Sequence, residues 1–234
     1  MKSLLSGEIA AIDIIAFVWF LICWGGYNWF ASHGQHGKGS LVGASHGYRL
    51  QWARQLLQRE NRVADSSLIG NLMSSVSFYA NTTIYVIAGL MALWSTLDQT
   101  MGILSELPFA RQSARALWEL RLVLLIFVFV FAYFKFTWAL REFNLLSIMI
   151  GAAPDSKTVA AADHGHEIYA QKMAAVNSMA GDEFNRGVRS YYFGLAALAW
   201  FIQPWLFIGA ATLVVVVLYR RDYASPLLKI LQQD

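Results

Sequence analysis

Four long apolar runs limit what this chain can fold into more than any other feature of its sequence. They cover residues 9–30, 68–95, 117–138 and 191–218. Each is at least as long as the roughly 20 residues that a helix needs to cross the hydrocarbon core of a bilayer. Only 14% of the residues are charged, which is too few to cover a water-facing surface. The sequence therefore predicts an integral membrane protein.

The runs are continuously apolar, which favours helices over a β-barrel. Strands of a membrane barrel alternate apolar and polar residues over about 10 positions, whereas a helix satisfies its own backbone groups within lipid. The head of the first run carries Glu8 and Asp13 where a signal peptide is positively charged, so we expect this run to remain as a membrane helix. We predict an all-α, four-helix membrane protein with one membrane domain over residues 1–234.

The basic residues indicate how the four helices are oriented. Four crossings place the long segments 31–67 and 139–190 on one side, and both termini with the 96–116 connection on the other. Ten Lys and Arg residues lie on the first side and seven on the second. The positive-inside rule then predicts cytoplasmic long loops and external termini in a multi-pass protein of the bacterial inner membrane.

The long loops contain helical patterns of their own. Apolar and basic residues alternate with helical spacing in YRLQWARQLLQRENR, and a second amphipathic stretch covers about 156–180. The third helix is predicted to continue to Gly151, with Pro154 following. A helix over 117–150 would be about 50 Å long, which exceeds the bilayer core of about 30 Å. We expect a helical layer on the cytoplasmic side.

A short motif, N-R-x-x-x-S-x-x-x-G, occurs before the second and before the fourth apolar run. Its members are Asn61, Arg62, Ser66 and Gly70 in the first copy and Asn185, Arg186, Ser190 and Gly194 in the second. An Asn can cap a helix start, an Arg can bind headgroup phosphate or the last carbonyls of a neighbouring helix, and a Gly admits a close helix. We interpret the motif first as a device for membrane entry and packing, and second as a binding site.

The matched positions of the two copies also suggest a duplication. Residues 9–95 and 117–218 would then be tandem helical hairpins, parallel to one another because a two-helix unit returns the chain to its starting side.

Polar residues in the second apolar run allow two interpretations. Asn71, Ser74, Ser77 and Asn81 are among several polar residues there. Such residues at membrane depth can form a hydrated path for a solute or ion. They can equally be small hydrogen-bonding residues at a seam between helices.

A metal site is the sharpest catalytic hypothesis. In DHGHE, Asp163, His166 and Glu167 share one helical face, and carboxylate and imidazole ligands at this spacing could bind a divalent metal, completed by His33 or His36. The alternative is a group of solvated polar residues near a helix start. No other cofactor is predicted, and the sequence contains no nucleotide-binding or kinase signature.

Two residues interrupt the apolar runs. Lys135 lies near the end of the third run and is expected to extend to the interface, or to pair with Glu142. Pro204 is expected to kink the fourth helix near its middle. The single cysteine, Cys23, excludes an intramolecular disulfide.

The stretches FKFTWALREFNLLSIMIGAAP (134–154) and FNRGVRSYYFGLAALAWFIQPW (184–205) resemble the bacterial membrane proteins of the domain of unknown function 599 family. ENR before the second run, G-x-R-x-Y-Y-F and W-F-x-x-P carry the resemblance, which extends over most of the chain. It implies a four-span architecture and supplies no catalytic residues.

These observations favour a non-catalytic membrane subunit or scaffold that self-associates or docks on a larger membrane complex. The alternatives are a small transporter or channel with a path along the second helix, and a metal-dependent membrane enzyme that uses the loop histidines. The expected partners are the lipid bilayer and this protein itself or other membrane subunits. The net charge of +3, without a dense basic tract, does not indicate nucleic acid.

Overall fold

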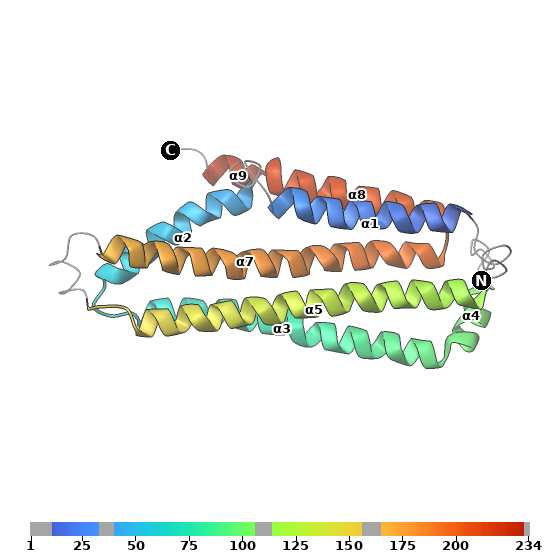
Figure 1. The fold of residues 1–234 in the computed structure, drawn as a ribbon, viewed down its shortest axis with the longest axis horizontal. Coiled ribbons are helices and arrows are strands. Elements are labelled where there is room, and N and C mark those ends of the chain that lie inside the picture. The colour runs from blue at the N-terminus through green and yellow to red at the C-terminus, as the bar shows by residue number, and fades with distance from the viewer. Residues whose placement is uncertain (1–10, 33–39, 106–113, 156–164, 232–234) are drawn as a thin grey trace. The chain divides into compact units, whose positions relative to one another are not determined.

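The computed structural model describes residues 11–32, 40–105, 114–155 and 165–231, and every regular element in these ranges is helical. The elements, shown in Figure 1, are α1 (Ala11–Ser32), α2 (Leu41–Gln58), α3 (Val63–Ser95), α4 (Leu97–Ser105), α5 (Arg115–Gly151), α7 (Gly165–Leu198), the 3₁₀ helix η2 (Ala199–Phe201), α8 (Pro204–Tyr223) and α9 (Pro226–Leu231). Within these described ranges, four helices are long and apolar enough to cross a membrane, over Ala11–Ser32, Val63–Ser95, Arg115–Gly151 and Pro204–Leu231. The prediction of an all-helical membrane fold is confirmed.

The chain divides into two compact units, each assembled from three stretches. Unit 1 is formed by the described parts of residues 1–31, 82–133 and 188–221, and unit 2 by those of 32–81, 134–187 and 222–234. The long helices α3, α5 and α7 therefore contribute one part to each unit. These boundaries cut across the proposed repeats 9–95 and 117–218, and the duplication stays a prediction.

Unit 1 has an aromatic core built around α1. Phe20 is completely buried, and its ring centroid lies 5.8 Å from that of Phe193 on α7 and 5.1 Å from that of Phe207 on α8. Trp24, one turn further along α1, meets Phe131 of α5 edge to face at 5.2 Å. Aromatic pairs at these separations add to the energy of simple burial. Large rings from α1, α5, α7 and α8 thus fix how the helices of unit 1 pack.

The fourth apolar run does not form one kinked helix, so that prediction is wrong. The chain ends α7 at Leu198, forms η2 and begins α8 at Pro204. Proline has no backbone N–H and excludes the helical conformation from the residue before it, yet it fits the first turn of a helix well. Pro204 therefore starts a new helix here. The hydropathy pattern does not reveal the turn before it, because Trp200, Phe201 and Ile202 are themselves apolar.

Contacts with α1 show that the chain reverses at this turn. The start of α1 contacts η2, which directly follows α7, through Asp13 and Trp200. Along α8, the indole of Trp19 donates to Thr212 Oγ1 at 3.0 Å, and the ring of Phe30 lies 6.3 Å from that of Tyr219. The later residue of α1 contacts the later residue of α8, so the two helices run in the same direction. They lie side by side in Figure 1.

The reversal changes the predicted positions of the chain ends. Because α1 and α8 run in the same direction, α8 leaves unit 1 at the end where α1 also leaves it, opposite to the end where α1 begins. A single helix over 191–218 would instead have returned the chain to the side of its N-terminus. The prediction that both termini lie on one side therefore does not follow from the observed helix directions.

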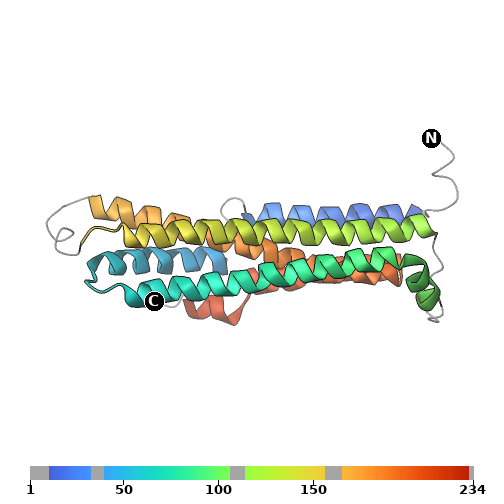
Figure 2. The same ribbon diagram turned by 90° about the horizontal axis from the view of Figure 1, so that it is seen from below.

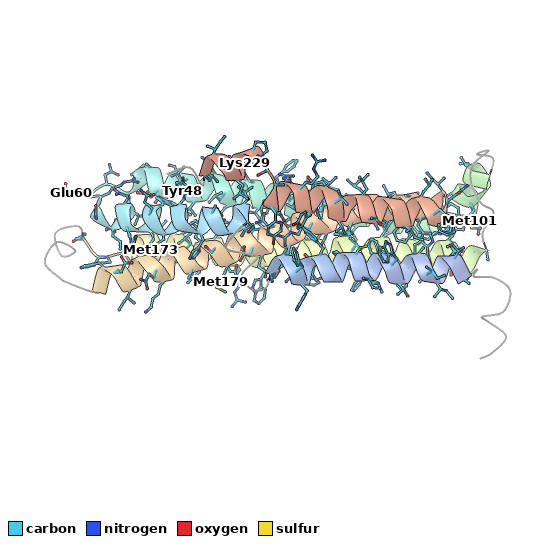
Figure 3. All side chains as sticks on the ribbon, turned by 90° about the horizontal axis from the view of Figure 1, so that it is seen from above. Tyr48, Glu60, Met101, Met173, Met179 and Lys229 are labelled. Atoms are coloured by element: carbon cyan, nitrogen blue, oxygen red, sulfur yellow. The ribbon has the colours of Figure 1, made fainter. Side chains whose placement is uncertain are left out.

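Unit 2 is a second helical bundle with a smaller apolar core. Helix α2 begins after Ser40, whose hydroxyl accepts a hydrogen bond from the Gly43 N–H at 3.2 Å, an N-cap that the amphipathic pattern alone did not indicate. Helix α9 lies against α2, and Figure 3 labels Lys229 on α9 and Tyr48 on α2. The buried apolar residues that α2, α3, α5 and α7 contribute to unit 2 are Ala53, Leu56, Leu57, Ile69, Val76, Ala80, Phe136, Ala139, Phe143, Leu146, Ile150, Ala170, Met173, Ala174 and Ala180.

Candidate functional site: the polar groups of the two units

A buried ion pair lies in the core of unit 1. The Asp13 side chain of α1 is 2% exposed and the Arg121 side chain of α5 is 1% exposed, with Arg121 Nη2 3.5 Å from Asp13 Oδ1. The indole Nε1 of Trp200 donates to the same oxygen at 2.9 Å. A buried carboxylate and guanidinium require such compensation, because each alone is costly to remove from water. The pair joins the start of α1, the first part of α5 and the α7–α8 turn.

Aromatic rings enclose the Arg121 guanidinium. Its carbon Cζ lies 5.8 Å from the ring centroid of Trp118, 5.6 Å from that of Trp200 and 6.0 Å from that of Phe201. Rings at these distances attract a cation. Sequence reasoning placed Asp13 near a helix start and did not pair it with Arg121, since the two residues are 108 positions apart. The only available signal was one acid and one base at the heads of two apolar runs.

The first copy of the repeated motif acts at the connection between α2 and α3. Asn61 Oδ1 accepts a hydrogen bond from the Val63 N–H at 3.0 Å, where α3 begins. Arg62 donates to the carbonyl oxygens of Ala153 at 2.8 Å and Pro154 at 2.5 Å, just after the end of α5. This copy therefore joins the start of one long helix of unit 2 to the end of another.

The second copy lies in the interior of α7. Asn185 is within Gly165–Leu198 and so caps no helix start, and Arg186 Nη1 contacts Glu183 Oε1 at 2.5 Å one turn away. The remaining positions also differ: Ser66 and Gly70 are exposed, whereas Ser190 and Gly194 are buried. A Cβ on Gly194 would lie 2.9 Å from Phe129 Cζ, whereas a Cβ on Gly70 would have no atom within 4 Å. The two copies of the motif therefore have the same residue types but different structural environments.

The predicted polar path lies on the outside of the α3 part of unit 2. Asn71, Ser74 and Asn81 are exposed and Ser77 is half-buried. Ser75, next to them, donates its hydroxyl to the Asn71 carbonyl of its own helix at 3.0 Å. Neighbouring helices of unit 2 do not enclose these side chains.

The predicted metal ligands are only partly described. Asp163 lies outside the described residues, as do His33, His36 and His164. Glu167 is engaged by Arg54, whose Nη2 lies 2.6 Å from Glu167 Oε1 and whose Nε lies 2.9 Å from Glu167 Oε2. The hydrogen bonds from Arg54 hold the pKa of Glu167 below its ordinary value. Both ring nitrogens of His166 are buried, with no hydrogen-bond partner among the described residues.

Three described charges of unit 2 form a cluster that sequence reasoning did not foresee. Lys135 Nζ lies 2.7 Å from Glu183 Oε2, so this lysine pairs with Glu183 of α7, a partner that the sequence did not indicate. Because Glu183 also contacts Arg186, one largely buried carboxylate joins a cation of α5 to a cation of α7. Among the described ranges, no three His, Cys, Asp or Glu side chains are grouped closely enough to hold a metal ion.

A second charged contact in unit 2 depends on a glycine. A Cβ on Gly181 of α7 would overlap the guanidinium of Arg49 on α2, so Gly181 leaves the space that this side chain occupies. Burial lowers the pKa of Arg49, and the nearby Asp182 carboxylate acts in the opposite direction. Arg49 therefore serves α2–α7 packing.

Nearly every charged group described above has a structural partner. No curated protein matches the chain, and no solved structure matches it. The family model described as "Protein of unknown function, DUF599" matches residues 15–227. This match covers most of the chain and agrees with the resemblance found at 134–154 and 184–205. The chain belongs to the DUF599 family of proteins of unknown function.

Proposed function

We propose that the chain is a non-catalytic scaffold of the bacterial inner membrane, with the helices of unit 1 embedded in the bilayer and the long loops in the cytoplasm, and that it associates with a second copy through α5. The observation that carries the proposal is one exposed apolar stripe along α5. It consists of Phe127, Phe134, Trp138, Leu145 and Ile148, whose exposed fractions range from 49% to 67%.

The spacing places the stripe on one face of the helix. At 100° per residue its five members fall within an arc of about 80°. Arg141 lies in the same arc, with its guanidinium 5.1 Å from the ring centroid of Trp138. The stripe therefore presents a continuous surface, since the charged residue within it packs on a ring.

The stripe is too far along α5 for lipid to cover all of it. Helix α5 has 37 residues, about 55 Å, against a hydrocarbon core of about 30 Å. A core that begins near the buried Trp118 would end near Trp138, about 20 residues later. Leu145 and Ile148 would then be exposed to water. Exposed apolar patches of this kind mark contacts with other proteins.

A second copy is the partner that suits this surface best. The partner must have an apolar face that lies in the bilayer and continues into the cytoplasm, and this face must leave the bilayer at the same depth as the stripe on α5. Two α5 helices related by a two-fold axis along the membrane normal meet this requirement, because both cross from lipid to water at the same residues. Trp138 would meet its own counterpart near the interface.

The revised helix directions support a cytoplasmic location of the long loops. Placing the end of α8 and helix α9 on the side of the long loops adds Arg220, Arg221 and Lys229 to that side. The balance of Lys and Arg then changes from ten against seven to thirteen against four. An excess of this size is what the positive-inside rule describes for the cytoplasmic side.

The end of α7 supplies a fifth segment to unit 1 although it is not among the four apolar candidates. Ser190, Phe193, Ala197 and Trp200 are each no more than 1% exposed. One face of this segment packs on other helices, so only its other face, which carries the exposed Leu195 and Leu198, has to be apolar toward lipid. With five segments, we expect the start of α1 outside and the end of α8 on the side of the long loops.

The two alternatives have weaker support. A transporter path along α3 would need side chains enclosed by helices, whereas Asn71, Ser74 and Asn81 lie on an exposed face. A divalent metal at Glu167 would have to displace Arg54 from both carboxylate oxygens.

Disulfide trapping tests the proposed interface. In a Cys23→Ala background, Ile148→Cys should form an intermolecular disulfide on mild oxidation of intact membranes. Ser147→Cys is the matched control, because Ser147 is also exposed but its Cβ points about 100° away from that of Ile148, further from the stripe. Efficient trapping at position 148 and little at 147 is expected. Equal trapping at both positions, or none at 148, would reject α5 as the interface.

A further inference from the structure

Unit 1 contains an apolar cavity that none of its described side chains fills. The cavity has a volume of about 270 Å³ and lies among α3, α4, α5 and the end of α7. Leu90, Leu97, Trp118 and Leu122 form its buried wall. Short helix α4 contributes Leu97 and Thr100 to the lining, and Figure 3 labels Met101 on that helix. Thr100 supplies the one hydroxyl of the lining, and it donates to the Thr96 carbonyl of its own chain at 3.1 Å.

The cavity has an opening on the surface of unit 1. Two of its lining residues, Leu93 on α3 and Leu198 at the end of α7, are 43% and 49% exposed. Both are apolar, so the opening faces hydrocarbon if unit 1 lies in the bilayer. An apolar cavity without polar partners does not hold water well, and smaller ones bind apolar molecules.

A charged rim lies next to the cavity. Arg115 Nη1 contacts both carboxylate oxygens of Asp98 at 2.8 Å, and Arg115 Nε contacts Glu119 at 3.0 Å. Asp98 follows Leu97 and Glu119 follows Trp118 in the sequence, so these charges stand beside two cavity residues. With two carboxylates and one guanidinium, this rim can face both the ammonium and the phosphate of a zwitterionic headgroup. Apolar volume beside an exposed, charged rim matches the two parts of a phospholipid.

We propose that this cavity binds one acyl chain of a phospholipid, whose headgroup rests on the rim formed by Asp98, Arg115 and Glu119. The inference rests on the embedding of unit 1 in the bilayer and is independent of self-association through α5. The acyl chain of the lipid enters between Leu93 and Leu198 and lies against the Trp118 ring. The bound lipid then holds α4 against α3 and α5.

Native mass spectrometry of the purified full-length protein tests this site. The protein is delipidated in detergent and then incubated with dioleoyl phosphatidylethanolamine. One phospholipid per chain should remain bound after transfer to the gas phase. Leu198→Trp places a large ring at the opening and should reduce the lipid-bound fraction at least tenfold. Leu195→Trp is the matched control, since Leu195 is 61% exposed on the same helix and does not line the cavity.

Several results would overturn the proposal. They are a wild-type chain that retains no phospholipid, a Leu195→Trp variant that loses as much lipid as Leu198→Trp, and the co-purification of an isoprenoid in place of phospholipid. If Leu198→Trp does not fold, Leu93→Trp replaces it at the other side of the opening. A Leu93→Trp variant that folds and keeps its lipid also contradicts the site.

Discussion

The Trp200 indole donates a hydrogen bond of 2.9 Å to the Asp13 carboxylate, and so joins the turn after α7 to the start of α1. The same carboxylate oxygen faces Arg121 at 3.5 Å. One acceptor therefore holds three segments of unit 1 that are far apart in the sequence. The Asp13 carboxylate therefore anchors the turn at Ala199–Phe201, where the chain reverses, to helix α1.

Replacing Asp13 should destabilise unit 1 strongly. Asp13→Ala removes the carboxylate while Arg121 stays buried, and breaking a buried pair on one side typically costs about 3–5 kcal/mol. Unfolding in mixed micelles, followed by circular dichroism, measures the loss. Asp98→Ala is the control, because Asp98 is 72% exposed in its ion pair and should lose much less. Equal losses of stability in the two variants would contradict the prediction, because they would show that burial of the Asp13–Arg121 pair does not determine its contribution to stability.

The glycines of the repeated motif should respond in opposite directions to alanine. Gly194→Ala places a Cβ 2.9 Å from the Phe129 ring and is expected to cost about 1–3 kcal/mol through overpacking. Gly70→Ala meets no atom within 4 Å and should gain up to about 1 kcal/mol from higher helix propensity. Unfolding midpoints of the two variants check this. A similar effect at both sites would restore the interpretation that the copies are equivalent.

This difference shows where sequence reasoning was sufficient and where it was not. The first three apolar runs predicted long helices correctly, because crossing a bilayer requires that composition, whereas the fourth run contains the turn before Pro204. The motif predicted equal roles for Asn61 and Asn185, but the residues before Asn185 are themselves helical, which leaves no helix start to cap. The ion pairs of Lys135 and Arg121 depend on partners in distant segments. Local spacing carries no information about such partners.

The Arg54–Glu167 pair should make the α2–α7 contact sensitive to acid. The folded-state pKa of Glu167 is lowered, mainly by its hydrogen bonds from Arg54. A lowered carboxyl pKa gives stability that is present above the ordinary value of 4.5 and is lost as the pH falls below it. Amide hydrogen exchange at the start of α7 should therefore rise below pH 4.5, after correction for intrinsic rates. Glu167→Gln should show no such rise, and a rise as steep as in the wild type would assign the effect to another group.

The reversal before Pro204 predicts termini on opposite sides of the membrane. A fluorescent protein that folds only in the cytoplasm should be bright when fused after Asp234. Alkaline phosphatase, which is active only outside the cytoplasm, should be inactive at the same position. An active phosphatase fusion at the C-terminus, with a dark fluorescent one, would contradict the five-segment arrangement of unit 1.

Self-association through α5 is the central claim, and the mass of the protein in lipid nanodiscs tests it most directly. Light scattering, corrected for lipid, should give a protein mass of two 26.2 kDa chains for the wild type. Leu145→Glu combined with Ile148→Glu should give one chain while keeping the helical circular dichroism spectrum, because both side chains are exposed in the single chain. A wild-type protein that is strictly monomeric at all concentrations would contradict the account, as would a double variant that remains dimeric.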